Sequence, residues 1–384
     1  MTPELADSFI DSVAAYVHIP FCSTICPYCD FAVVAGQDDL AERYVDAVVS
    51  EISMSDTWRD LDAVYFGGGT PSHVDPVLLA RILEALAGHH GIAVDAEISL
   101  EANPEDFSKD RADLLKQIGF NRVSFGAQSF DAGVLVSLGR RHQADQILIS
   151  VNAARDAGFE NLSLDLIYGE PGESTESWVE TVERAIALQP DHLSCYALTV
   201  EPGTPLGRAV REGARAPIPD VQADRYEALE QMLEMERYEV SNWSSTGFEC
   251  RYNLTVWAQG QYEAYGNGAH GFRDGVRFRN LRRLDAYIEA AEKGQLPRAG
   301  ADTIEGWDEE VDRLFVGLRR TVGVAHGDGT RALLDSDDGG RLIEGGVIET
   351  DESRLRVARP LMTDAVHRSV LALQPPIVSG KSDA

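Results

Sequence analysis

The chain has few positive charges. Its 384 residues include 34 Lys and Arg against 63 Asp and Glu, which gives a formal net charge of −29 at pH 7. Nucleic-acid backbones and anionic membrane surfaces both attract basic proteins, so this composition argues against either as a partner. We therefore expect no nucleic-acid ligand.

The sequence also lacks long hydrophobic runs. No stretch of about 18 apolar residues is present, which a transmembrane helix would require. The first residues, MTPELADSF, are acidic and lack the basic start and apolar centre of a signal peptide. We therefore expect a cytoplasmic protein without a transmembrane segment, in a compartment where thiols stay reduced.

Cysteine is scarce, with five residues in the chain, yet three of them fall within eight positions. Cys22, Cys26 and Cys29 follow CxxxCxxC spacing inside the segment YVHIPFCSTICPYCDF, which spans residues 16–31. Thiolates are soft ligands that select zinc, copper(I) or iron–sulfur clusters. Buried structural cysteines have no reason to gather on one loop, so the spacing predicts a metal centre.

The number of thiolates bears on the kind of metal centre. A structural zinc site has four protein ligands, so zinc would need His18 or a distant residue as the fourth. A [4Fe–4S] cluster held by three cysteines leaves one iron free to bind a substrate or a cofactor. We favour the cluster. A zinc site, a disulfide with one spare thiol and ordinary buried cysteines are the alternatives.

Apolar strands and helices alternate over the first 204 residues. Strands are expected to begin near residues 14, 63, 96, 122, 162 and 192, each followed by a segment with helical spacing. This alternation predicts a parallel sheet covered by helices, and right-handed crossovers wind such units into an open sheet or a barrel. Six units fit a partial barrel. The helix over residues 76–88 is expected to stop at its glycine.

Polar residues and glycines stand where the predicted strands end. Glu101, Gln128 and Asp165 lie at or near the ends of successive strands, and the strand after the cysteine loop ends in Gly67-Gly68-Gly69. In α/β barrels this rim is where the chemistry occurs. Glycine has no Cβ and lets the backbone approach a ligand closely. Taken singly, each of these residues is an ordinary turn or rim residue.

The pattern changes after residue 295. Residues 306–320 predict a helix, and residues 339–373 predict a helix, a two-stranded hairpin around Asp351-Glu352 and a closing helix. This outline is winged-helix-like, but it has no basic stripe for DNA, so we expect a small cap on the barrel. The expected division is a core with its extension over 1–295, an α+β domain over 300–374 and a disordered tail over 375–384.

The segment YxHIPFCxxxCPYCDF resembles the radical S-adenosylmethionine (SAM) superfamily, and within it the oxygen-independent coproporphyrinogen III oxidases and the related haem chaperones (HemW-like). The resemblance covers roughly residues 13–285. It implies an α/β fold, with a partial (βα)6 TIM-like barrel and a small C-terminal α+β domain. It also implies that the three cysteines hold a [4Fe–4S] cluster and that SAM chelates the free iron. One electron from the cluster would then break a C–S bond of SAM and leave a 5′-deoxyadenosyl radical.

The resemblance further implies which residues bind SAM. They are Tyr16, Tyr28, Gly68, Gly69, Thr70, Glu101, Gln128, Arg140, Asp165 and Ala197. The glycine backbone would hold the amino group, carboxylates and amides suit the ribose hydroxyls and the cationic methionyl part, and Arg140 suits the carboxylate. His18 is the predicted catalytic residue, a hydrogen-bonding group beside the cluster or substrate. The alternative is an ordinary strand histidine.

Two features favour the haem chaperones over the oxidases. The oxidases carry one more cysteine two residues after the third, whereas this chain has Cys29-Asp30-Phe31, the ending seen in the haem chaperones. The oxidases also have a longer N-terminal extension, and only 21 residues precede Cys22 here. We therefore expect a protein that binds haem and passes it to an acceptor protein.

Other functions stay open. The alternative is an oxidase that decarboxylates coproporphyrinogen III oxidatively to protoporphyrinogen IX, with an electron donor such as flavodoxin or ferredoxin. A radical SAM enzyme with another substrate and a zinc-stapled binding barrel are further alternatives.

The expected haem motif departs from the family pattern. The haem chaperones typically show HNxxYW, and the matching segment here is Tyr252-Asn253-Leu254-Thr255-Val256-Trp257. Histidine is a common axial ligand of haem iron and tyrosine a possible one, so Tyr252 is the predicted haem-binding residue. Cys250 and His270 are further candidates. The alternative is a purely structural segment that closes the barrel.

Overall fold

One twelve-stranded sheet forms the body of the protein. The computed structural model describes residues 2–375, and the predicted disordered tail lies, except for its first residue, outside the described residues. The strand order is β14-β13-β12-β11-β1-β4-β5-β6-β7-β8-β10-β9. The six central strands are β1 (Val13–Ile19), β4 (Leu61–Gly68), β5 (Ile92–Ala102), β6 (Arg122–Gln128), β7 (Asn161–Tyr168) and β8 (His192–Ala197). All six run parallel, which confirms the predicted α/β barrel core.

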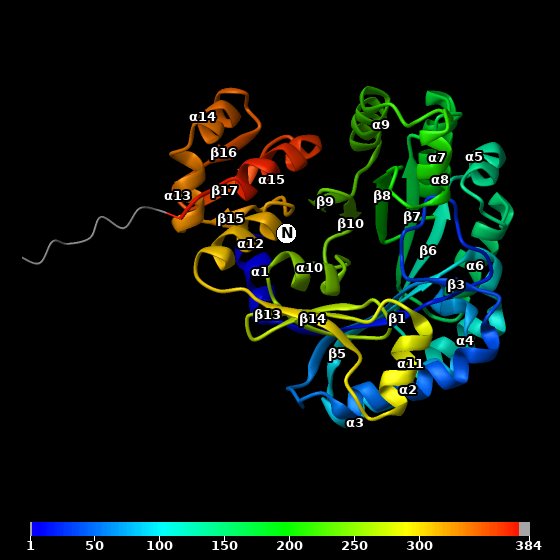
Figure 1. Ribbon diagram of the computed structural model, residues 1–384. Helices are drawn as coiled ribbons and strands as arrows, with labels where there is room; N and C mark the ends of the chain where they lie inside the picture. The colour runs from blue at the N-terminus through cyan, green and yellow to red at the C-terminus, as the bar shows by residue number, and fades with distance from the viewer. Residues whose placement is uncertain (1, 376–384) are drawn as a thin grey trace, which may run out of the picture.

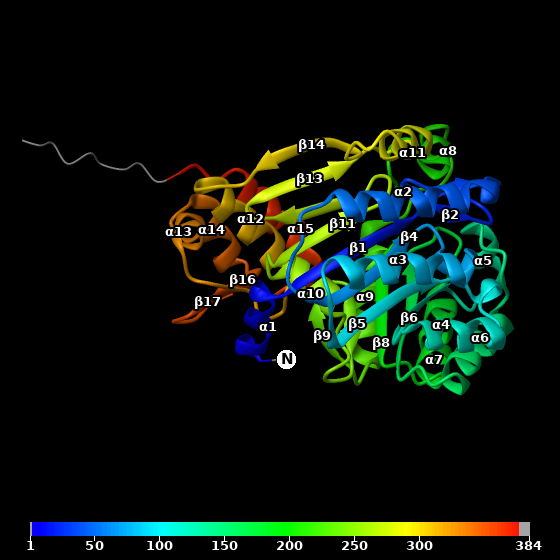
Figure 2. The same ribbon diagram turned by 90° about the horizontal axis from the view of Figure 1, so that it is seen from below.

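Helices cover the outer face of these parallel strands (Figures 1 and 2). They are α2 (Ala41–Met54), α3 (Pro76–His89), α4 (Lys109–Ile118), α6 (Ala144–Asp156) and α7 (Thr175–Ala187). In α3, Leu79, Ile82 and Leu86 are fully buried at helical spacing and form the stripe that packs on the sheet. The expected stop at Gly88 is wrong. The helix continues to His89, and the glycine with positive φ is Gly91.

Further elements lie before, between and after the barrel units. The helices are α1 (Pro3–Ser8), α5 (Ala132–Ser137), α8 (Pro205–Arg211) and α9 (Pro219–Met232). The strands β2 (Phe21–Cys22) and β3 (Val34–Ala35) pair in parallel and frame the cysteine loop. Among residues 2–375, no helix is both long enough and apolar enough to cross a membrane.

The sheet is extended at both sides of the barrel core. On one side β11 (Gln261–Tyr265) joins β1 in parallel, and β12 (His270–Arg273), β13 (Val276–Asn280) and β14 (Arg298–Thr303) follow in antiparallel order. On the other side β10 (Asn242–Ser244) and β9 (Glu236–Glu239) are antiparallel. The end strands β14 and β9 do not pair with each other, so the barrel is partial, as predicted.

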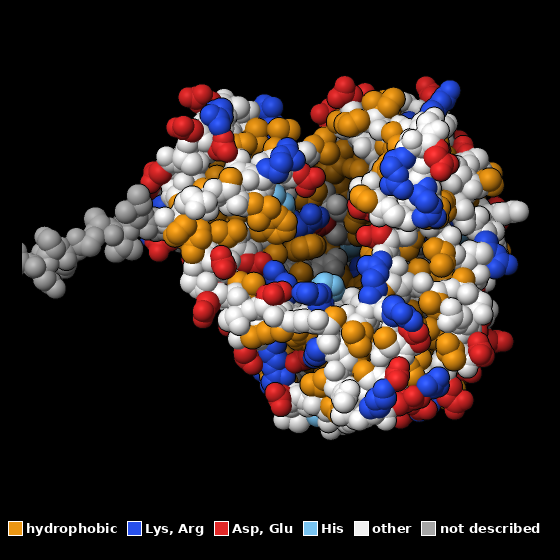
Figure 3. Space-filling model, viewed as in Figure 1, with side chains coloured by type: hydrophobic (Ala, Val, Ile, Leu, Met, Phe, Trp, Pro, Cys, Tyr) orange, Lys and Arg blue, Asp and Glu red, His pale blue; other side chains and the backbone are white. Residues whose placement is uncertain are grey.

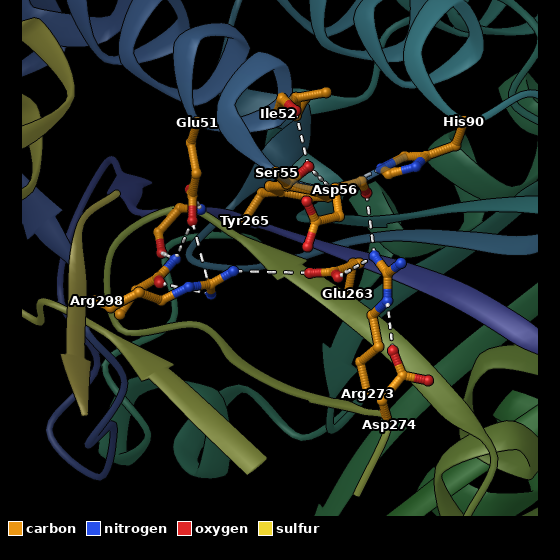
Figure 4. Close-up of polar contacts among 12 residues, drawn as sticks. Glu51, Ile52, Ser55, Asp56, His90, Glu263, Tyr265, Arg273, Asp274 and Arg298 are labelled. Carbon is orange, nitrogen blue, oxygen red and sulfur yellow. Dashed lines mark hydrogen bonds and ion pairs between the residues drawn. The ribbon is translucent and has the colours of Figure 1, made fainter. Parts of the chain in front are cut away.

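A buried carboxyl group on α2 ties the extension to the barrel (Figure 4). Glu51 is fully buried. Its oxygens accept hydrogen bonds from the Gly266 amide at 2.9 Å, the Asn280 side chain at 2.7 Å and the Tyr287 hydroxyl at 2.5 Å. The Arg298 guanidinium lies 3.9 Å from Glu51 and 3.7 Å from Glu263. These donors offset part of the loss of water around this carboxyl group.

The C-terminal part (residues 307–371) has its own small sheet and core. It contains the three-stranded sheet β15-β17-β16 and a separate cluster of buried side chains that includes Leu314, Leu355 and Val366. Its elements are α12 (Trp307–Gly317), β15 (Val324–Ala325), α13 (Asp328–Leu334), α14 (Asp337–Glu344), β16 (Ile348–Thr350), β17 (Arg354–Val357) and α15 (Thr363–Leu371). Since β14 belongs to the large sheet, the exact division at 295 and 300 stays a prediction.

The C-terminal part contacts both sides of the open sheet. Next to β9, the Thr321 amide donates to the Tyr238 carbonyl oxygen at 3.0 Å. At the other side, Asp312 of α12 accepts two hydrogen bonds from Arg277 of β13, at 2.7 and 3.0 Å. Figure 1 shows α1 beside the C-terminal part, close to β15 and α12.

Candidate functional site

A cavity of about 580 Å³ lies at the C-terminal ends of the six parallel strands. Its walls include all three cysteines of the predicted cluster and every residue predicted to bind a cofactor: Tyr16, Cys22, Cys26, Tyr28, Cys29, Gly68, Gly69, Thr70, Glu101, Gln128, Arg140, Asp165, Ala197 and Tyr252. Parallel strands bring their C-terminal ends to one edge of a sheet, which is why residues so far apart in sequence meet here.

The cysteine loop forms one wall of the cavity, and two polar groups point at its sulfur atoms. The Thr70 hydroxyl donates to Cys22 Sγ and the Arg140 guanidinium to Cys26 Sγ, each at 3.6 Å. Burial raises the pKa of the Cys22 thiol to about 11 and also raises the pKa of the Cys29 thiol. A bound metal centre would keep these groups as thiolates, since a coordinating thiol is deprotonated outright.

The geometry does not favour His18 as the fourth ligand of a zinc site. Both nitrogens of the proposed fourth ligand, His18, are already engaged, Nδ1 with the Tyr16 hydroxyl at 3.2 Å and Nε2 with the Ala32 carbonyl oxygen at 3.0 Å.

His18 lies outside the cavity lining, behind the wall. It packs under Gly68 and bonds the cysteine loop through Ala32, so the structure shows it as a supporting group. Its catalytic role stays a prediction.

The glycines at the end of β4 are required by close packing. Gly68 has φ +105°, and a Cβ there would lie 2.2 Å from the His18 ring. A Cβ on Gly69 would lie 2.6 Å from the Ile19 carbonyl oxygen. Only glycine fits at such contacts, so the backbone itself forms this part of the cavity wall.

Two half-buried carboxyl groups line the same cavity. Burial, with a contribution from the charge of Asp165, raises the pKa of Glu101 to about 7. Burial also raises the pKa of Asp165, which accepts a hydrogen bond from Ser124 at 2.9 Å. Glu101 accepts from the Tyr65 hydroxyl at 2.9 Å and from the Gly68 amide at 3.0 Å. Such fixed acceptors suit the hydroxyl or cationic groups of a ligand.

The sequence reasoning missed further wall residues, among them Tyr65, Asn103, Arg122 and Gly126. Arg140 donates to Asn103 Oδ1 at 2.5 Å and to the Gly126 carbonyl oxygen at 2.9 Å. A Cβ on Gly126 would lie 2.9 Å from Gln128 Nε2 and 3.2 Å from Arg140 Nη2. The available signal was a glycine within a predicted strand, because such a glycine often marks a place where a ligand or another segment comes close to the backbone.

The backbone of Gln128 is strained. Its φ is +63°, which is uncommon for a residue with a side chain. Strained residues gather at functional sites, and this one stands at the end of β6 against the cavity.

The predicted haem segment forms a helix, α10 (Arg251–Trp257), at the edge of the cavity. The Tyr252 ring stacks on Tyr65 at 5.2 Å and on Tyr16 at 5.8 Å between ring centroids. Burial raises the pKa of Tyr252 well above its usual value. Neither of the other two candidates lines the cavity. Cys250 is fully buried, and His270 is exposed on β12.

Comparison with known proteins decides the family. Residues 16–185 match the model of the Radical SAM superfamily. Over 386 aligned residues the chain is 36% identical to the protein named "Heme chaperone HemW" of Mycobacterium tuberculosis (strain H37Rv), with 96% of this chain and 97% of that protein covered. The chain belongs to the HemW haem chaperone family.

Other comparisons agree with this HemW assignment. The "Heme chaperone HemW" of Bacillus subtilis (strain 168) is 35% identical over 321 residues, with 81% of this chain and 84% of that protein covered. The solved coproporphyrinogen III oxidase (HemN) of Escherichia coli superposes with a TM-score of 0.80 over 96% of this chain and 93% of the oxidase, at 22% identity. That likeness shows a shared fold. Membership in the radical SAM superfamily implies a [4Fe–4S] cluster and SAM, and the resemblance stated from the sequence is confirmed.

Proposed function

We propose that this protein is a cytoplasmic haem chaperone of the radical SAM type, which binds haem and passes it to an acceptor protein. The observation that carries the proposal is the 36% identity to a haem chaperone across almost the whole of both chains. The ending Cys29-Asp30-Phe31, without a fourth cysteine, supports it.

Cys22, Cys26 and Cys29 would hold the [4Fe–4S] cluster. When bound, such a cluster supplies an electron and one open iron site to SAM. Thr70 and Arg140 donate hydrogen bonds toward two of the sulfur atoms, which stabilises negative charge on them. The chain itself thus offers three ligands and a charged environment that fit an anionic cluster.

The SAM site would lie against the same loop. The backbone at Gly68 and Gly69 would receive the amino group, because no side chain blocks it. Glu101 and Asp165 would accept hydrogen bonds from the ribose hydroxyls and balance the cationic sulfonium, since both carboxyl groups are fixed by donors. Arg140 is held at the cavity wall by Asn103 and would bind the SAM carboxylate.

The oxidase function is the second candidate, because the fold matches the E. coli coproporphyrinogen III oxidase closely. An oxidase would consume SAM with an electron donor such as flavodoxin or ferredoxin, and its substrate would be a porphyrinogen. The missing fourth cysteine after Cys29 weighs against this candidate.

One set of measurements separates the two functions. After anaerobic reconstitution with iron and sulfide, the protein should hold about four irons per chain. Titration with hemin should then give saturable binding of one haem per chain. Incubation with SAM, a reductant and coproporphyrinogen III should give no protoporphyrinogen IX. Decarboxylation without saturable haem binding would favour the oxidase and overturn the chaperone.

A further inference from the structure

The three haem-ligand candidates differ in what they present to a ligand. The Tyr252 ring is stacked between other tyrosines, and Cys250 is fully buried with its pKa raised by burial to about 12. His270 is exposed on β12, and within residues 2–375 neither of its ring nitrogens has a hydrogen-bond partner. An exposed imidazole with a free nitrogen is the side chain best suited to bind haem iron.

His270 is surrounded by positive charge in an otherwise acidic protein. Arg279 lies directly across from His270 in the β12–β13 pair, so the two side chains share one face of the sheet. Burial, followed by the charges of Arg279, Arg277 and Arg282, lowers the pKa of His270. The imidazole is therefore neutral near pH 7, which is the form that ligates a metal.

Two of these arginines are available to an anionic ligand. Arg277 is held by both oxygens of Asp312, at 2.7 and 3.0 Å. Arg279 forms an exposed ion pair with Asp302 at 3.2 Å. Exposed ion pairs contribute little to stability, so Arg279 can leave Asp302 for an anionic ligand. Arg282 is exposed and donates to a backbone carbonyl oxygen of the cysteine loop.

This surface adjoins the cysteine loop. A Cβ on Gly268 would lie 2.7 Å from the Ala32 Cβ, and Gly268 belongs to the turn that leads into β12, which begins at His270. The neighbouring Phe31 is 61% exposed. Phe31 lines both the large cavity and a second hollow of about 420 Å³, whose wall also includes Arg282.

The space-filling view supports a binding surface on this face. Figure 3 shows a hollow between the C-terminal part and the barrel, with apolar side chains on its upper wall. Basic side chains and a histidine gather at its lower edge, above the region that Figure 1 labels β13 and β14. An apolar wall facing a basic edge matches haem, which has a flat apolar ring and two carboxylates.

We propose that haem binds on this surface, with His270 as the axial ligand of its iron, Arg279 and Arg282 paired with its propionates, and the Phe31 ring against its apolar face. The proposal rests on the haem chaperone function. It places haem beside the cavity for the cluster and SAM. The residues that would bind haem lie outside the segment 252–257, which matches the family's HNxxYW motif.

Hemin titration of the full-length protein, followed by the Soret band, tests the assignment. His270→Ala should raise the dissociation constant at least about tenfold and remove the imidazole-type spectrum, and added imidazole should restore that spectrum. The double variant Arg279→Ala/Arg282→Ala should weaken binding without shifting the band. His326→Ala, at an exposed histidine of the C-terminal part, should bind as the wild type does.

The outcomes separate the two proposals. If the wild type shows no saturable haem binding, the chaperone function fails and the site fails with it. If the wild type binds haem and His270→Ala keeps the same affinity and spectrum, the site is wrong and the function stands. Loss of binding in Tyr252→Phe with retention in His270→Ala would assign the ligand to Tyr252. Unchanged circular dichroism and iron content in each variant show that the chain is folded.

Discussion

Ionisation of Glu51 should cost the folded protein stability. Burial outweighs its hydrogen bonds with Tyr287 and Gly266 and the charge of Arg298, and raises the pKa of Glu51 from 4.5 to about 7. In the unfolded chain the same group is solvated and titrates near 4.5. Between these two values the unfolded chain has lost the proton while the folded protein keeps it, so the free energy of unfolding falls as pH rises.

The size of the effect follows from these two pKa values. The difference between 4.5 and about 7, at about 1.4 kcal/mol per pH unit, amounts to about 3 kcal/mol. This contribution is fully present below pH 4.5 and is lost as pH passes through about 7. Glu51→Gln carries no ionisable group, so its stability relative to the wild type should increase by about 3 kcal/mol over this range.

Urea titrations of the two proteins at a series of pH values, followed by circular dichroism, measure this difference. Glu101 and Glu173 also have raised pKa values through burial, but they are present in both proteins and cancel. Glu84→Gln, at an exposed position of α3, is the matched control. The reasoning about this buried group is refuted if the free energies of unfolding of wild type and Glu51→Gln change in parallel with pH. It is also refuted if the wild type becomes more stable relative to the variant as pH rises.

Three further predictions concern packing, the cluster and the C-terminal part. Gly68→Ala should destabilise the protein by at least about 1–2 kcal/mol, because φ is +105° and its Cβ would meet an imidazole ring at 2.2 Å. Gly88→Ala, which has open space on α3, should be neutral or stabilise by about 0.5–1 kcal/mol, as thermal melting will show. Replacing any loop cysteine with alanine should abolish the visible absorption band after anaerobic reconstitution, whereas Cys195→Ala should keep it. Asp7 of α1 pairs with Arg354 of β17 at 2.5 and 3.0 Å, and Asp7→Asn removes the negative charge from this pair. The substitution should lower the free energy of unfolding by about 1–3 kcal/mol. It should also speed proteolysis in the segment before α12. The packing prediction is wrong if Gly68→Ala melts at the wild-type temperature. The cluster prediction is wrong if the absorption band survives the loss of a loop cysteine, and the last prediction is wrong if Asp7→Asn resists protease as the wild type does.

The barrel core was predictable because its signals are local. A run such as VAAYVHI is apolar except for His18, as is typical of a strand buried on both faces, and it became β1. Ser108 caps the start of α4 and Gly119, in the left-handed conformation, ends it, and both residue types are local signals of helix ends. The cysteine spacing likewise marked the loop that lines the cavity.

The extension was not predictable in the same way. Strand β13 reads VRFRN, and its alternating charges resemble a surface loop until its neighbours on both sides are known. Glu51 has helical spacing and reads as an exposed position. Its acceptor role depends on Gly266 and Tyr287, which lie 215 and 236 residues further along the chain. Contacts over such separations leave no trace in a short window of sequence.

Contacts between residues far apart in the sequence also decide which residues line the cavity. His18 is removed from the cavity by the Gly68 backbone and by the Ala32 carbonyl, both of which belong to other segments. Gly126 has no room for a side chain because the Gln128 and Arg140 side chains fill the space beside it. A sequence window shows which residues are near a strand end, but not which of them face the ligand.

The C-terminal part covers one edge of the large sheet. Strand β9 is the last strand of that sheet. Arg320 pairs with Glu239 on its outer side, and the Thr321 amide donates to the Tyr238 carbonyl oxygen. Without residues 307–371, this strand would offer a ready template to which a second chain can add a strand. The barrel and its C-terminal neighbour should therefore be produced as one chain, since an isolated barrel is expected to self-associate.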